Sequence, residues 1–118
     1  MAKSVGDILR KLVSDRAKTL DKTYDKKYPN ANNQSKQDRT QRNIDILKSI
    51  SNARRAGKEL TPKDLAYMVW DASAKKGTGW HGADGRPMTA DKIENLIASD
   101  MAKAGLRSPD SASGGTGG

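Results

Sequence analysis

The chain has 118 residues, a formal net charge of +8 and no cysteine. This length allows a single domain, and the absence of cysteine excludes a disulfide framework, a thiolate nucleophile and a cysteine-based metal site. The longest apolar run, Ala66 to Trp70, is too short for a membrane span or a signal-peptide core. We therefore expect a cytoplasmic or intraviral protein that is not secreted and does not span a membrane.

The excess positive charge is confined to the first half of the chain. Residues 1–60 carry 15 Lys and Arg against 7 Asp and Glu, whereas residues 61–118 carry 7 of each. A localised positive region is typical of a protein that meets a polyanion. Leu, Ile, Val and Phe together contribute only 17 residues, so we expect a thin hydrophobic core that a partner or an oligomer completes.

The first half predicts two long basic helices. Apolar residues recur at three- and four-residue steps in residues 4–26, which is the pattern of one buried helix face. A second helix is expected over residues 35–56, with Gly57 suited to the left-handed residue that follows a last turn. Ser4 and Ser35 are each followed three residues later by an aspartate, the spacing of a capping box, and are the predicted N-caps.

The second half predicts a compact pair of helices over residues 61–76 and 89–104. Thr61 has the N-cap position, with a proline and an aspartate in the turn that follows it. The first helix of the pair is apolar on two sides, so we place it at the centre of the core, around Trp70. Gly105 is expected to end the second helix.

Together these elements predict an all-α fold, a small bundle of about four helices in a single domain over residues 1–106. A glycine-rich connector joins the third and fourth helices, and residues 107–118, rich in Ser and Gly, are expected to form a flexible, disordered tail. The apolar stripe of the first helix either docks on the compact pair or reaches a second chain.

Three charged residues fall where the helical pattern requires apolar ones: Arg16, Arg54 and Asp100. An arginine can pack its stem and extend its guanidinium to water. An aspartate has no such stem and needs a partner or an open site. We therefore hypothesise that Asp100 pairs with Arg16 or with Arg54; the alternative is that Asp100 faces a partner subunit.

The unbalanced basic residues form the candidate nucleic-acid-binding site, centred on the loop between the first two helices. Its predicted members are Lys26, Lys27, Lys36, Arg39, Arg42, Arg55 and Lys58. The expected start of the second helix adds exposed backbone N–H groups that suit a phosphate. The alternative interpretation is a solvated, charged helix face.

The connector from Gly77 to Met88 contains the only histidine, His81, and a predicted turn at Asp84-Gly85. One histidine without cysteine is a poor metal site, so we expect no metal and no cofactor. The first interpretation is that Trp80 covers the core. The second is a partner-binding loop that presents Trp80 and Arg86.

These patterns favour a non-enzymatic, nucleic-acid-binding accessory protein that contacts the phosphate backbone of DNA or RNA with low sequence specificity. No pair of acids and no nucleophile with a base can be assembled into an active site, so we do not expect an enzyme. The alternative is a structural or adaptor protein, such as a component of virus-particle assembly. In that case the apolar stripe of the first helix is the interface with a protein partner or another copy.

Overall fold

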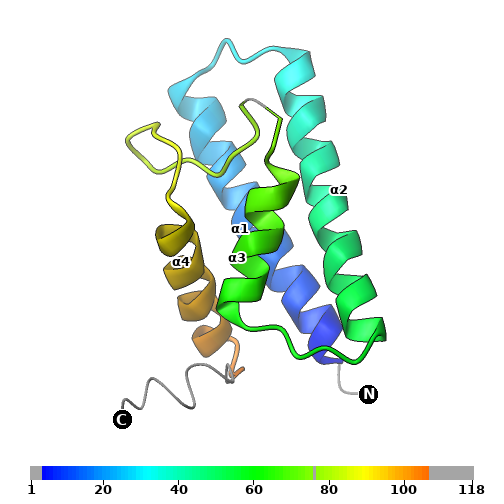
Figure 1. Ribbon diagram of the computed structural model, residues 1–118. Helices are drawn as coiled ribbons and strands as arrows, with labels where there is room; N and C mark the ends of the chain where they lie inside the picture. Colours follow the sequence, from blue (N-terminus) through cyan, green and yellow to red (C-terminus); the bar gives the residue numbers. More distant parts are fainter. Residues whose placement is uncertain (1–3, 76, 107–118) are drawn as a thin grey trace.

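The structure is a computed structural model that describes residues 4–75 and 77–106. These residues form four α-helices: α1 (Val5–Lys27), α2 (Asn33–Arg55), α3 (Pro62–Ala72) and α4 (Ala90–Lys103) (Figure 1). The prediction of an all-α bundle of about four helices is therefore confirmed. The tail predicted for residues 107–118 lies outside the described residues.

The four helices form a ring around one core. Helices α1 and α2 pack as a long hairpin, α3 packs on α2 and on α4, and α4 packs back on α1. In Figure 1 the α1–α2 loop and the connector between α3 and α4 lie at the same end of the bundle. The α2–α3 linker lies at the opposite end, so α1 and α2 each run the length of the molecule.

Local sequence signals set most of the helix ends. Thr61 and Asp64 form a reciprocal capping box, each side chain accepting from the other residue's backbone N–H. Gly57 and Gly105 have φ angles of +83° and +79°, and Leu106 N donates to Met101 O at 2.9 Å, which closes α4.

Two helix boundaries differ from the prediction. The N-cap of α2 is Asn32, whose side-chain oxygen accepts from Ser35 N at 2.8 Å; Ser35 lies in the first turn instead of capping it. Asn32 has the extended backbone that an N-cap requires, and asparagine is as good a cap as serine. Helix α3 ends at Ala72, earlier than expected, where the Ser73 hydroxyl donates to Val69 O at 2.6 Å.

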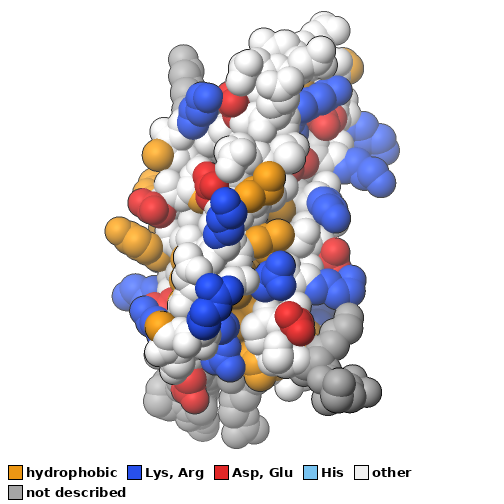
Figure 2. Space-filling view, turned by 90° about the vertical axis from the view of Figure 1, so that its right-hand side faces the viewer, with side chains coloured by type: hydrophobic (Ala, Val, Ile, Leu, Met, Phe, Trp, Pro, Cys, Tyr) orange, Lys and Arg blue, Asp and Glu red, His pale blue; other side chains and the backbone are white. Residues whose placement is uncertain are grey.

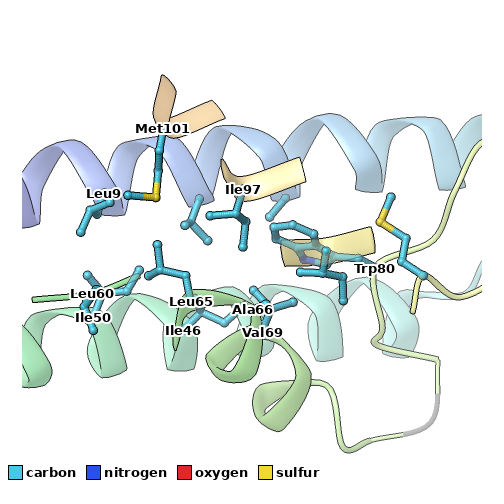
Figure 3. Close-up of a cluster of buried hydrophobic side chains, with 14 residues drawn as sticks. Leu9, Ile46, Ile50, Leu60, Leu65, Ala66, Val69, Trp80, Ile97 and Met101 are labelled. Atoms are coloured by element: carbon cyan, nitrogen blue, oxygen red, sulfur yellow. The ribbon is translucent and has the colours of Figure 1, made fainter. Parts of the chain in front are cut away.

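The core draws on every helix (Figure 3). Leu9 and Val13 of α1 are each 1% exposed and face a core to which the other helices and the linkers contribute. Its remaining buried members are Ala17, Ile46, Ile50, Leu60, Leu65, Ala66, Val69, Trp80, Met88, Ile93, Ile97 and Met101. Leu9, Val13 and Ala17 of the apolar stripe of α1 are thus buried within the chain, whereas Val5 is 42% exposed and Ile8 and Leu12 are half-buried. The core covers only part of the stripe that was considered as an interface with another protein.

Trp70 does not lie at the centre of the core, where the sequence pattern placed it. Trp70 is 54% exposed and Tyr67 is 70% exposed, because Leu65, Ala66 and Val69 form the side of α3 that faces the core. The helical period places residues 67 and 70 on the other side.

Trp80 is 1% exposed, so the interpretation in which it covers the core agrees with the structure and the one in which it meets a partner does not. The connector folds back as a short hairpin, with Met88 N donating to Trp80 O at 2.8 Å and Gly85 at its turn with a φ of +83°. This hairpin inserts the indole ring between the helices. Arg86 remains exposed at the hairpin.

Candidate nucleic-acid interface

Two of the predicted phosphate-binding residues, Arg39 and Arg42, are buried. Their exposed fractions are 3% and 1%. Arg42 donates to Asp21 Oδ2 at 2.7 Å, to the Thr78 carbonyl at 2.8 Å, and to the side chain of Asn43. Arg42 therefore joins α1, α2 and the connector, and it is not available to a phosphate in this fold.

Arg39 extends the same buried network toward the loop between α1 and α2. Its guanidinium donates to Asp25 Oδ1 at 2.8 Å and lies 3.8 Å from Asp21 Oδ1. The same group lies 5.0 Å from the centre of the Tyr24 ring, at cation–π distance. The inclusion of Arg39 and Arg42 in the phosphate-binding site was wrong, because carboxylates of α1 already bind both side chains.

Burial governs the electrostatics of this network. Loss of solvent lowers the pKa of Arg42 from its usual value, and the neighbouring charge of Asp21 opposes that shift. An arginine stays protonated at neutral pH even so, because the ordinary pKa of a guanidinium lies far above neutral pH. Arg42 is therefore a buried cation that depends on Asp21 for its charge partner.

The other predicted members do not lie together. Lys26, Lys27 and Lys36 lie at the loop end of the α1–α2 hairpin, while Arg55 and Lys58 lie at the opposite end. Along α2, the 19 residues from Lys36 to Arg55 correspond to about 28 Å. Lys58 also forms an ion pair with Asp64, with 3.7 Å between Nζ and Oδ1. The predicted single patch is thus divided between the two ends of the bundle.

The structure instead brings four cations together between α1 and α2. One hollow of about 340 Å³ has Arg10, Lys48 and Arg55 in its lining, together with Ile44 and other α2 side chains. A second, of about 400 Å³, shares Arg10 and adds Lys11. We call these adjoining hollows the basic groove, defined by its cations Arg10, Lys11, Lys48 and Arg55.

Acidic residues neutralise only the α1 side of the basic groove. Arg10 lies 3.6 Å from Asp7, and Lys11 lies 2.8 Å from Asp15. Within the described part of the chain, Lys48 and Arg55 of α2 make no ion pair. Figure 2, which faces the α2 side of the bundle, shows Lys and Arg along the whole face, with fewer acidic side chains between them and hydrophobic ones along the middle.

Sequence reasoning found only Arg55 among these four cations. The signal that could have identified the others is their angular position. Arg10 and Lys48 lie beside the buried faces of α1 and α2, on the flanks that meet when the two helices pack antiparallel.

Asp100 receives a charged partner from α1. Arg16 donates through Nε and Nη2 to the two oxygens of Asp100, at 2.9 and 2.7 Å. The hydrogen bond to Asp100 raises the pKa of Arg16. Arg54, the other partner considered, donates to the Lys58 carbonyl at 3.2 Å instead, and its stem packs close to Gly6.

His81 packs its ring on Tyr24, with 4.7 Å between the ring centroids, and burial lowers the pKa of His81.

Across residues 4–75 and 77–106, no group of three or more His, Cys, Asp or Glu side chains is placed to hold a metal ion. In the same residues, no helix is long and apolar enough to cross a membrane.

Comparison with known proteins does not extend this description, because no protein-family model, no curated protein and no solved structure matches the chain.

Proposed function

We propose that this protein is a non-enzymatic accessory protein that binds the phosphate backbone of DNA or RNA with low sequence specificity. The observation that carries the proposal is the basic groove, where two helices contribute Arg10, Lys11, Lys48 and Arg55 to one surface. The setting of such a protein is the cytoplasm or the interior of a virus particle.

The groove suits a nucleic-acid backbone in both charge and shape. Its cations come from α1 and α2, so they border the open hollows between the two helices instead of one helix face. Ser51 and Asn52 add groups that can donate to phosphate oxygens. Ile44, which is 41% exposed, supplies an apolar surface for a sugar. Contacts of this kind with phosphate and sugar carry no information about the bases, which is the reason for low specificity.

Fluorescence anisotropy with labelled duplex DNA and RNA of unrelated sequences tests this proposal. We expect binding at low salt to both, with affinities that agree within about threefold between sequences, since phosphate contacts carry no sequence information. The logarithm of the affinity should fall linearly with the logarithm of salt concentration, by about 0.9 per phosphate contacted on duplex DNA. No binding at micromolar protein in low salt overturns the proposal.

A matched pair of variants locates the site. Lys48→Ala with Arg55→Ala removes two groove cations and should lower the salt slope on duplex DNA by about 1.8. Lys92→Ala with Lys103→Ala removes the same charge from α4, which lies diagonally across the bundle from α2. Equal losses for both pairs indicate attraction by net charge alone and contradict a site in the groove.

The structural or adaptor role remains the second candidate, and the surface that supports it best lies on α3. Leu9 and Val13 of the α1 stripe are buried, whereas Tyr67 and Trp70 of α3 are exposed. Large exposed aromatic residues close together on a helix are typical of a protein–protein contact.

A further inference from the structure

The outer face of α3 carries a short, ordered pattern of side chains. Lys63, Tyr67 and Asp71 follow one another at four-residue steps, and Trp70 lies beside them. All four are exposed, with Tyr67 at 70% and Trp70 at 54%. In Figure 2, where the α3 side of the molecule forms the left-hand edge, acidic, hydrophobic and basic side chains follow from top to bottom at that edge.

The two charges on this face oppose the dipole of their own helix. Lys63 is the second residue of α3 and Asp71 the second to last, so a cation lies at the positive end and an anion at the negative end. Helices α1, α2 and α4 each have a basic residue in the last turn, and α3 has none. Within the described residues, neither Lys63 nor Asp71 has an ion-pair or hydrogen-bond partner. These charges therefore do not serve the helix that carries them.

From this pattern we propose that a second copy of the chain docks on the outer face of α3, in an antiparallel contact between the two α3 helices. A two-fold axis near Tyr67 brings Lys63 of each copy to Asp71 of the other, because each charge lies four residues from Tyr67. The two Tyr67 rings meet at the axis. Lys63 of one copy also reaches the Trp70 ring of the other, where a cation–π contact is favourable.

The face is self-complementary, and this selects a second copy over an unrelated partner. An isologous contact needs a surface that matches its own image under a two-fold rotation. The row Lys63, Tyr67 and Asp71 meets that requirement. On a facing antiparallel helix the order of the three residues is reversed, so each cation lies opposite an anion and the tyrosines lie opposite each other. The contact leaves the basic groove of each copy free, so this inference extends the proposed function without resting on it.

The size of the face indicates a weak dimer. From Lys63 to Asp71 the helix rises only about 12 Å, so the interface belongs to the smallest class, below about 1,200 Å² in total. We expect a dissociation constant of about 100 µM, which makes the dimer concentration-dependent. Sedimentation velocity of the full chain up to about 1 mM, roughly ten times that constant, measures it.

Charge reversal provides the decisive variants. Lys63→Asp and Asp71→Lys each place like charges together across the axis and should weaken the dimer at least about tenfold. Both changes improve the fit to the helix dipole, so the fold should persist, and circular dichroism checks this. An equimolar mixture of the two single variants restores opposite charges and should dimerise, as should the double variant.

Two further variants complete the test. Lys92→Asp makes the same charge change in the first turn of α4 and should dimerise like the unmodified chain, whereas Trp70→Ser should not dimerise. The proposal is overturned if the unmodified chain stays monomeric at about 1 mM. It is also overturned if either single reversal dimerises as well as the unmodified chain, or if their mixture stays monomeric.

Discussion

Basic residues at the two ends of the α1–α2 hairpin lie in opposite environments. At the loop end, Arg39 and Arg42 point inward and are at most 3% exposed. At the other end, Lys48 and Arg55 of the same helix line an open groove. Helix type and residue class are the same at both ends, so neither explains the difference.

The residue that each side chain meets on α1 does explain it. Asp21 and Asp25 lie where α1 faces the first turns of α2, and they supply carboxylates that pair with the incoming guanidinium groups. Farther along the hairpin, α1 contributes Leu9 and Val13 to the interior, and neither side chain could pair with a buried cation. A buried charge is tolerated only where a counter-charge lies opposite it. At the other end the inward positions of α2 are held by Ile46 and Ile50, and Lys48 and Arg55 lie outside that face.

The largest expected effect is at Arg42, and it tests this comparison directly. Arg42→Met retains much of the side-chain volume but leaves Asp21 with only the distant Arg39 contact and the Thr78 carbonyl without its donor. We expect the free energy of unfolding to fall by about 3 kcal/mol. Urea denaturation measures this change.

Lys48→Met is the matched control, because it also replaces a cation of α2 with methionine, but on the exposed side of the helix. It should change the free energy of unfolding by no more than about 0.5 kcal/mol. If Arg42→Met and Lys48→Met change the free energy of unfolding by similar amounts, the cations at the two ends of the hairpin do not differ in their contribution to stability.

The next effect concerns the pair between α1 and α4. Arg16 and Asp100 retain 25% and 13% side-chain exposure, so solvent weakens their attraction relative to that at Arg42. A double-mutant cycle with Arg16→Met and Asp100→Asn should give a coupling energy of about 1 kcal/mol. Additive effects of the two changes, measured by thermal denaturation, would mean that the bidentate geometry adds nothing to stability.

The smallest effect is the pH dependence at His81, beside the buried end of the hairpin. Burial lowers the pKa of His81 below 6.5, and Arg42 and Arg39 add to this shift against a hydrogen bond with the Gly79 backbone. The unfolded chain therefore binds a proton at a higher pH than the folded chain. The contribution of His81 to stability is complete above about pH 6.5 and is lost as the pH falls toward the lowered pKa.

Urea denaturation at pH 7.5 and pH 5.5 should show this loss. The unmodified chain should be destabilised more than His81→Gln between the two pH values, since glutamine does not titrate. An equal drop in both proteins would assign the pH dependence to other groups, such as the carboxylates of the buried network.

The sequence alone determined the helices, because their signals are local. The capping box at Thr61 depends on residues three apart, and the ends at Gly57 and Gly105 depend on one glycine each. The apolar period along α1 identified its buried face without knowledge of the other helices. Asn32 was missed as the cap of α2 only because Ser35 offers the same chemistry three residues later.

Tertiary structure decided which charged and aromatic side chains are inside. The sequence of α2 does not show that Arg42 meets Asp21, a residue 21 positions earlier, or the backbone of Thr78, 36 positions later. The choice of Trp80 over Trp70 likewise depends on a connector that folds back over the core. Helix formation follows from neighbours along the chain, whereas burial of a charge or a large ring depends on what the fold places opposite it.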